Sequence, residues 1–360
     1  MNDPAVQQNF APYDGVLFLS FGGPEGPEDV VPFLENVLRG RNVPRERMLQ
    51  VAEQYRILGG KSPLNDQVRA LIAALREELA ASGPQLPIYW GNRNWHPFLE
   101  ETLRQMASDG IRRALVFVTS AYSSYSGCRQ YREDIARAQA AAGGQAPALD
   151  KLRVFFNHPG FIEPMIENTR KALAQLGESN EQSAALVFTA HSIPLSMSQT
   201  SRYNEQLEEV CRLVAGGLKR SDWRLVYQSR SGPPVQPWLE PDINAYLREL
   251  HSANPAASAA IIPIGFISDH MEVKFDLDTQ AMKTCADIGL KAVRVPTVGA
   301  HPKFIGMIRE LILERVDPAA PRRALGNLGP WHDVCPIDCC PAPVHAPQRG
   351  GRPSPSNAAG

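Results

Sequence analysis

The first residue with the means to do chemistry is His191, which ends the apolar run ALVFTAH at residues 185–191. The five residues from Leu186 to Ala190 are typical of a buried strand, and Pro194 follows too closely for the strand to continue. An imidazole has a pKa of about 6.5, so it can both take up and release a proton near neutrality. The sequence therefore allows a general base held at a strand end, or a histidine that only bonds a backbone carbonyl there.

A second candidate is the row of carboxylates in DHMEVKFDLD, residues 269–278. Asp269, Glu272 and Asp276 have the spacing i, i+3 and i+7, which puts them on one face of a helix that begins after a strand. Ordinary capping is the alternative, because the helix dipole favours carboxylates near an N-terminus. Since the preceding IIPIGFIS is apolar, we expect the row to lead outward from the interior, which suits a hard divalent cation or a proton path.

Apolar runs typical of buried parallel strands alternate along the chain with helical segments. The runs occupy residues 15–21, 86–92, 113–120, 152–158, 185–191, 224–230, 259–266 and 292–299. Amphipathic helices are predicted between them, for example over 27–40 and 64–83, and a last helix over 303–316. This alternation predicts an α/β fold of doubly wound parallel sheets in two similar domains, with a hinge near residues 141–150.

In open parallel sheets, ligands bind beyond the carboxyl ends of the strands, so the loops after the apolar runs should hold the site. These loops carry aromatic residues, arginines and the two acid–base candidates above. The sequence contains neither G-x-G-x-x-G nor G-x-x-x-x-G-K-[ST], and the serine motif G-x-S-x-G is also missing. These absences argue against binding of NAD or ATP and against the serine chemistry of α/β hydrolases.

The composition says more about the binding partners and the cellular location of the protein than about its activity. The 37 Lys and Arg nearly balance the 38 Asp and Glu, which gives no basic footprint for nucleic acid. No apolar run is long enough for a transmembrane segment, and the N-terminus lacks a signal pattern. We expect a soluble cytoplasmic protein, with a monomer favoured and with peripheral membrane contact through surface loops left open.

Six long stretches resemble the ferrochelatase family. They are LSFGGPEGPEDV, GGKSPLN, GNRNWHPF, AHSIP, YQSRSGPPVQPWLEPD and PIGFISDHMEVKFDLD, which stand in the family's order between residues 13 and 320. Ferrochelatases insert Fe²⁺ into a porphyrin, and the resemblance implies two Rossmann-like (chelatase) domains with parallel sheets and an intervening cleft. The versions LSFGGPEGP and GNRNW resemble the actinobacterial type, whose substrate is coproporphyrin III rather than protoporphyrin IX.

The resemblance also implies roles for individual residues. His191 and Glu272 would be catalytic and would meet the substrate Fe²⁺, with His191 accepting pyrrole protons, Glu272 lying across the macrocycle from it, and Asp276 continuing the acidic row. Glu25 departs from the family pattern, because some relatives carry a tyrosine there that can ligate the product iron. The porphyrin would contact Arg39, Ser62, Arg93, Asn94, Tyr122, Tyr125 and Trp238.

The strand pattern and the resemblance together predict the domain boundaries. Residues 12–147 with 300–322 would form the first Rossmann-like domain, and residues 148–299 the second, which bears the catalytic histidine and glutamate. Residues 323–341 would form a cysteine-bearing extension. Residues 342–360, which are rich in Pro, Gly, Ser and Ala, would be a disordered tail.

Three of the six cysteines crowd into WHDVCPIDCC. Without a signal peptide a disulfide framework is not expected, and the spacing is not that of a standard zinc knuckle. Incidental thiols in an unstructured tail and a structural zinc site are the alternatives. Many ferrochelatases hold a 2Fe-2S cluster on one internal and three C-terminal cysteines, so the resemblance implies an iron–sulfur cluster on Cys128, Cys335, Cys339 and Cys340. Cys211 and Cys285 are predicted to be buried in helices.

Other functions fit part of the pattern. A chelatase that loads cobalt or nickel into another tetrapyrrole would also use a histidine and a carboxylate, because several first-row ions accept these ligands. A non-catalytic porphyrin or haem carrier would need a firm axial ligand and no proton path, so the carboxylate row favours the enzyme. Protoporphyrin IX is the alternative substrate within the family.

Overall fold

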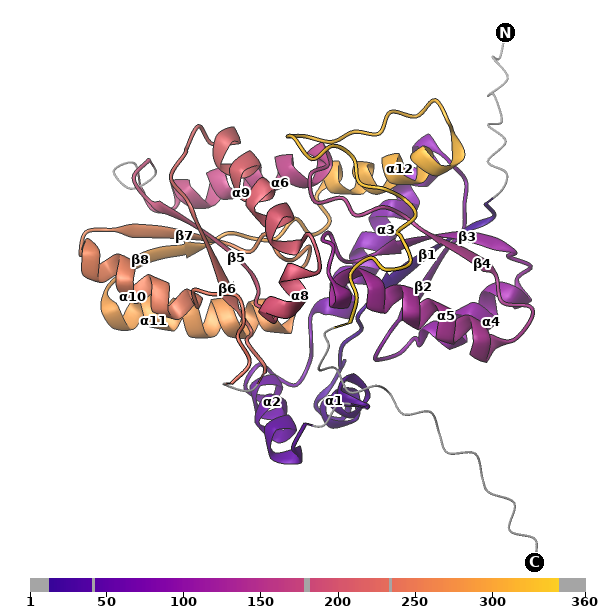
Figure 1. Ribbon diagram of the computed structural model, residues 1–360, viewed down its shortest axis with the longest axis horizontal. Coiled ribbons are helices and arrows are strands. Elements are labelled where there is room, and N and C mark those ends of the chain that lie inside the picture. Colours follow the sequence, from indigo (N-terminus) through magenta and orange to yellow (C-terminus); the bar gives the residue numbers. More distant parts are fainter. Residues whose placement is uncertain (1–12, 41–42, 178–181, 233–234, 343–360) are drawn as a thin grey trace, which may run out of the picture.

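Two four-stranded sheets organise the protein, whose computed structural model describes residues 13–40, 43–177, 182–232 and 235–342 (Figure 1). The first sheet has the strand order β2-β1-β3-β4 and the second the order β6-β5-β7-β8, and every pairing is parallel. Each sheet therefore repeats the same topology, which confirms the predicted α/β fold of two similar parallel sheets. The strands are β1 (Gly15–Ser20), β2 (Ile88–Asn92), β3 (Arg113–Val118), β4 (Ala148–Lys151), β5 (Ala185–His191), β6 (Arg224–Gln228), β7 (Ser258–Ile262) and β8 (Lys291–Arg294).

Helices cover both faces of each sheet, as burial of nearly continuous apolar strands requires. In the first half they are η1 (Pro27–Asp29), α1 (Val30–Leu38), α2 (Arg45–Ile57), α3 (Leu64–Ser82), α4 (Leu99–Ser108), η2 (Tyr125–Arg129) and α5 (Gln130–Ala142). In the second half they are α6 (Pro159–Ala174), α8 (Leu195–Gln199), α9 (Tyr203–Gly217), α10 (Ile243–Ala253), η3 (Val273–Ala281), α11 (Met282–Ile288) and α12 (Pro302–Val316). The segments predicted over 27–40, 64–83 and 303–316 are confirmed as helical.

One hydrophobic core continues from the first half into the second. At its centre Phe117 of β3 stacks on Phe155 at a ring-centroid distance of 5.3 Å, and Phe161 and Phe304 pack edge-on against Phe155. Helix α12 packs against α3 of the first half and α6 of the second, so it joins the halves although it comes last (Figure 1). The relative position of the two sheets is therefore fixed by buried aromatic contacts.

The strand predicted over 152–158 is wrong, because the strand in this region is β4 at Ala148–Lys151. It pairs with β3, so it belongs to the first sheet, and no hinge interrupts the sheet within 148–151. Residues 152–158 are buried because they run through the shared core, not because they pair in a sheet. We propose that the second domain begins after residue 151 rather than at residue 148.

The C-terminal extension is fastened to the body by buried polar groups. Arg153 forms an ion pair with Glu314 of α12 at 2.7 Å, with each side chain 1 % exposed, and donates to the carbonyl of Arg323 at 2.9 Å. Asn157 donates to the carbonyls of Leu325 and Gly329 at 3.2 and 2.8 Å. These contacts hold the extension across the fold, whereas residues 343–360 of the predicted tail lie outside the described residues.

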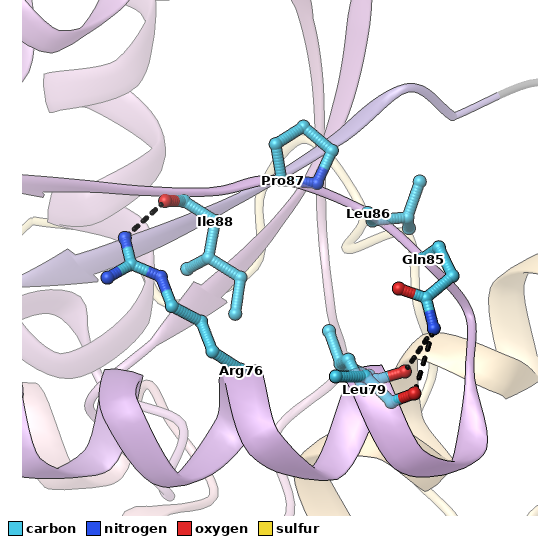
Figure 2. A pocket seen from close by; sticks show the side chains of 7 residues that line it. Arg76, Leu79, Gln85, Leu86, Pro87 and Ile88 are labelled. Atoms are coloured by element: carbon cyan, nitrogen blue, oxygen red, sulfur yellow. Dashed lines mark hydrogen bonds between the residues drawn. The ribbon is translucent and has the colours of Figure 1, made fainter.

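A surface hollow of about 320 Å³ lies away from the predicted site (Figure 2). Figure 2 shows Arg76 reaching the carbonyl of Ile88 and Gln85 reaching that of Leu79, at 3.1 Å each. Because Ile88 begins β2, this hollow lies at the amino end of the sheet. Ligands of open parallel sheets bind at the opposite end, so the hollow does not belong to the candidate site.

Candidate active site

His191 stands at the carboxyl end of the central strand β5, where its main chain is held from several directions. The Tyr203 hydroxyl donates to the His191 carbonyl at 3.1 Å, and the next residue, Ser192, bonds the Gln228 carbonyl at 2.8 Å through its N–H. Pro194 forms an antiparallel bridge with Trp238. The proline after the strand therefore turns the chain into a second, fixed segment and leaves the imidazole at a rigid edge.

The hydrogen bonds of the imidazole determine which nitrogen can do chemistry. Nδ1 of His191 lies 2.5 Å from the Ser192 carbonyl, and a carbonyl oxygen can only accept, so Nδ1 carries the proton. In the neutral ring Nε2 then has a free lone pair, and Nε2 lies 3.7 Å from Oε1 of Glu272. The His191 side chain is 31 % exposed. This geometry leaves Nε2 able to accept a proton or to bind a metal.

Glu272 lies directly beside His191, which corrects the expectation that a porphyrin ring separates them. A distance of 3.7 Å between the two side chains is too short to admit a flat macrocycle. Glu272 precedes η3, a π-helical segment, and its N–H is capped by Nδ1 of His270 at 3.1 Å. His270 is itself held edge-on against Phe266 at 4.4 Å, and burial lowers the pKa of its imidazole. His191 and Glu272 therefore approach any ligand from the same side.

Asp276 extends the carboxylate row, whereas Asp269 does not. Asp269 turns away to Arg294, whose Nη1 lies 3.0 and 3.1 Å from its two carboxylate oxygens. The Ser229 hydroxyl donates to Asp276 from a left-handed backbone position, φ +63°. The pKa of Asp276 is raised to about 6, chiefly by burial; the Ser229 hydrogen bond opposes this rise and the nearby charge of Glu272 supports it. The row that meets His191 thus consists of Glu272 and Asp276.

The raised pKa of Asp276 predicts a measurable pH dependence of stability. The native state keeps the Asp276 proton up to about pH 6, whereas the unfolded chain releases it near 3.8. The free energy of unfolding that this group contributes therefore falls as the pH rises through that interval. Relative to Asp276→Asn, the wild type should lose about 2 kcal/mol between pH 4 and pH 7, since each pKa unit is worth about 1.36 kcal/mol and part of the contribution is already lost at pH 4. Urea unfolding of both proteins at several pH values measures this difference, and parallel curves would contradict it.

Tyr55 of α2 lies near the candidate site, and the sequence reasoning did not predict it. Burial raises the pKa of its phenol, and the charge of Glu272 raises it further, so the hydroxyl lies within the electrostatic reach of that carboxylate. Its ring packs against Phe33 of α1 at 6.0 Å. The available signal was its position in QYRILGGKSP, directly before the double glycine and the predicted Ser62.

The predicted porphyrin anchors differ in how available they are. Arg39 is exposed at the end of α1 and bonds Asn36 of the same helix. Arg93 is instead paired with Asp134, and its guanidinium lies 4.4 Å from the ring centroid of Tyr131. The Arg93 side chain is only 7 % exposed. The exposed guanidinium of Arg39 is therefore accessible to a carboxylate of a ligand, whereas that of Arg93 is already paired with Asp134.

Ser62 and Asn94 both contact the loop that follows β1. The N–H of Ser62 bonds the Pro24 carbonyl at 2.9 Å, and its hydroxyl accepts from the N–H of Leu64 at 3.3 Å. The Asn94 amide donates to the Phe21 carbonyl at 3.2 Å. These two residues shape the loop at the strand end.

Of the aromatic candidates, Tyr122 and Trp238 are buried and Tyr125 is partly buried. Tyr122 is buried and donates to the Ile264 carbonyl of the second half at 2.8 Å. The Tyr125 hydroxyl donates to Glu133 at 3.1 Å, and its ring packs at the edge of the shared core. Trp238 lies so close to Gly232 that a Cβ there would sit 2.4 Å from its ring, and its buried indole N–H has no acceptor among the described residues. Trp238 is thus the aromatic residue with a spare donor.

The four predicted cluster cysteines gather at one place, although Cys128 and Cys335 are far apart in sequence. Sγ of Cys339 lies 3.6 Å from Sγ of Cys340, and the thiol of Cys128 is hydrogen-bonded to Cys335. Cys335, Cys339 and His332 have ligand atoms within 4.8 Å of one another. The hydrogen bond with Cys335 and the charges of nearby basic residues lower the pKa of the Cys128 thiol. Soft thiolate donors with a basic surround fit an iron–sulfur cluster.

Known proteins resemble this chain in sequence over most of its length. The family model described as "Ferrochelatase" matches residues 13–316. A "Ferrochelatase" from Rhodopirellula baltica is 55 % identical, over 96 % of this chain and 99 % of that protein. A "Coproporphyrin III ferrochelatase" from Frankia alni is 52 % identical, over 94 % and 89 %.

Among solved structures, a multi-domain protein from Deinococcus radiodurans described as similar to chelatases matches with a TM-score of 0.52. The match has 14 % identity and covers 84 % of this chain and 55 % of that one, so it bears on the fold alone. None of the helices among the described residues is long and apolar enough to cross a bilayer. The family match and the sequence relatives extend over nearly the whole chain, and the chain therefore belongs to the ferrochelatase family, whose members insert iron into a porphyrin.

Proposed function

We propose that this ferrochelatase inserts Fe²⁺ into coproporphyrin III and produces coprohaem III for haem biosynthesis. The observation that carries the mechanism is the pair formed by Nε2 of His191 and Oε1 of Glu272, 3.7 Å apart at the carboxyl end of the second sheet. The choice of coproporphyrin is supported by relatives of that name from Frankia alni and Streptomyces griseus, which are 52 % and 50 % identical.

Insertion exchanges one Fe²⁺ for two protons. The two pyrrole N–H protons occupy the space that the metal must enter, so they have to leave as the iron–nitrogen bonds form. Nε2 of His191 has the free lone pair to accept these protons one at a time, and Glu272 stabilises the imidazolium that results. Asp276, whose pKa is raised to about 6 by burial, is matched to receive a proton from the Glu272 side near neutral pH.

The substrate metal meets the same residues. A neutral imidazole nitrogen and two carboxylates form a donor set that Fe²⁺ accepts. His191, Glu272 and Asp276 would therefore hold Fe²⁺ on the side from which protons are withdrawn. The one lone pair on Nε2 cannot hold the iron and a proton at the same time, so the iron would pass from Nε2 to the macrocycle before Nε2 takes up a pyrrole proton.

The porphyrin would bind along the strand ends of both halves. Arg39 would pair with a propionate, since its guanidinium is exposed. Trp238 would offer its spare indole N–H and an apolar face near Pro194. The remaining proposed contacts, which would shape the walls around the ring, are Ser62, Arg93, Asn94, Tyr122 and Tyr125.

We also propose that Cys128, Cys335, Cys339 and Cys340 hold a 2Fe-2S cluster. When bound, such a cluster supplies one-electron redox chemistry. Arg129 donates to the carbonyls of Ile337 and Cys339 at 3.0 and 3.2 Å, so it joins the loop of Cys128 to the C-terminal thiols. As a further part of the proposal, we place the enzyme in the cytoplasm as a monomer.

Cys128→Ser is expected to abolish the cluster. Serine removes the thiolate from the body of the protein, and the three C-terminal cysteines cannot supply a full set of four ligands. Protein purified without oxygen should lose its bound iron, acid-labile sulfide and visible absorption. Cys211→Ser is the matched control, because that thiol is buried in α9 away from the others and should leave all three signals intact. Equal iron and sulfide in the two variants would contradict the assignment.

The substrate is tested by mixing the enzyme without oxygen with Fe²⁺ and either coproporphyrin III or protoporphyrin IX. Absorption spectra follow the conversion of each porphyrin. Fast conversion of coproporphyrin with slow conversion of protoporphyrin is the expected result. The reverse preference would overturn the substrate and keep the reaction, and binding of both without conversion would overturn the reaction.

A further inference from the structure

The turn that leads into Glu272 is held by a side chain from the other half of the molecule. Gln67 lies on α3, next to the first sheet, and Asp269 lies 202 positions later. Nε2 of Gln67 donates to the Asp269 carbonyl at 2.9 Å, and Oε1 of Gln67 accepts from the Asp269 N–H at 2.8 Å. One side chain therefore occupies both main-chain hydrogen-bonding groups of a single residue.

A carboxamide is suited to this contact because its two ends donate and accept in one plane. Gln67 thus bonds Asp269 much as a neighbouring strand would, and a shift of the turn would break both bonds together. The Asp269 side chain is fixed separately by Arg294, at 3.0 and 3.1 Å. Its main chain is consequently tied to the first half while its carboxylate is tied to the second.

The same arginine also fixes the far end of the segment. Nε of Arg294 donates to Asp278 at 2.6 Å, and Lys274 donates to Asp278 at 2.9 Å. The stretch between Asp269 and Asp278 contains both Glu272 and Asp276, so its two ends are anchored while the reactive carboxylates project from its middle. Within the second half, His191 has its own anchors, the Tyr203 hydroxyl and the segment after Ser192.

We infer that Gln67 is a positioning residue, which sets the distance between Glu272 and His191 through the main chain of Asp269. Its contact crosses from one half to the other, so it makes the geometry of the pair depend on how the two halves pack. The inference rests on the proposed role of Glu272 in turnover. Displacements of about 1 Å in a catalytic group can cost about 100-fold in rate, so a loosened turn should be visible in kcat.

The test measures iron insertion by Gln67→Ala and Gln67→Glu. Alanine removes both bonds, and glutamate, which has nearly the same shape, keeps the acceptor and loses the donor. We expect kcat to fall about 10-fold in Gln67→Ala and at least as far in Gln67→Glu, because the second carboxylate oxygen of glutamate would face the Asp269 carbonyl as one acceptor against another. KM for porphyrin should stay unchanged, because positioning rather than binding is affected. Gln85→Ala is the matched control, since Gln85 also bonds two main-chain carbonyls but lies at the amino end of β2. That control should keep the wild-type kcat.

A double-mutant cycle separates positioning from general loosening. If Gln67 acts through Glu272, Gln67→Ala should cost much less in the background of Glu272→Asp than in the wild type. Equal losses in both backgrounds, a rise in KM with kcat unchanged, or wild-type kcat in Gln67→Ala would each overturn the inference. Wild-type kcat in Glu272→Gln would instead overturn the role of Glu272 on which the inference rests, so the two failures are distinguishable.

Discussion

Replacing Glu272 by glutamine is expected to lower kcat for iron insertion by about 100-fold or more while porphyrin binding stays intact. Glutamine keeps the shape of the side chain but removes the negative charge beside Nε2 of His191, which lies 3.7 Å away. An imidazolium formed by proton uptake would then lack its partner, and the substrate iron would lose a carboxylate ligand. Binding should survive because Glu272 lies at the proposed reacting centre, whereas the proposed propionate anchor, Arg39, lies on another element.

Two measurements check this expectation together. Turnover is followed by the absorption change on iron insertion, and porphyrin affinity by quenching of protein fluorescence. Glu249→Gln, an exposed position on α10, is the matched control and should keep the wild-type kcat. His191→Ala should show a similar loss, and the double variant should be little worse than either single one, because the two residues act as a unit. A Glu272→Gln enzyme that turns over at the wild-type rate would remove this residue from the mechanism.

Glu314→Gln is expected to destabilise the protein by about 3–5 kcal/mol, because it leaves the buried Arg153 charge without a partner. Both side chains are 1 % exposed, so water cannot replace the lost carboxylate. The pair also orders the start of the extension, since Arg153 donates to the Arg323 carbonyl at 2.9 Å. The expected effect is therefore a lower urea midpoint together with earlier release of the extension to a protease.

The matched control is an exposed pair of the same kind. Glu205→Gln breaks the ion pair with Arg202, whose side chain is 55 % exposed, and should change stability by about 0–1 kcal/mol. Replacing Arg153 and Glu314 together by apolar residues should cost less than either single change, since no charge is left unpaired. Equal urea midpoints for Glu314→Gln and Glu205→Gln would show that burial of the pair does not determine its contribution.

The sequence by itself determined the parts of this protein that depend on local patterns. Unalternating apolar runs can be buried on both faces, which predicted the parallel strands, and seven of the eight regions contain one. Helical spacing predicted α3, whose Val68, Leu71 and Leu75 are all buried. A histidine between a core strand and a proline marked the end of β5. The six long stretches quoted above also carried the resemblance to the ferrochelatase family, which the comparisons bear out.

Local pattern failed where burial has another cause. The run at 152–158 reads as a strand because it is apolar, yet it is buried by the shared core and by α12, and the paired strand is the more polar β4 just before it. Likewise Asp269 shares a helical face with Glu272 in the sequence, but Arg294, brought close by the end of β8, draws its carboxylate away. An apolar run or a helical spacing shows which secondary structure a segment tends to form. Whether that segment joins a sheet or a site depends on residues distant in the sequence.

Only the tertiary structure decided the contacts that cross between the halves. Tyr55 and Gln67 lie on helices of the first half, and no spacing relates them to the segment of Asp269 and Glu272 some two hundred residues later. The side on which Glu272 meets His191 also depended on the fold, because His191 ends β5 whereas Glu272 lies in the segment after β7. The sequence thus named the groups that we propose take protons and bind iron, and long-range packing determined which of them meet. The physical reason is that the charge and hydrogen-bonding groups of a side chain are set by its residue type, whereas the distance between two side chains is set by the packing of the whole chain.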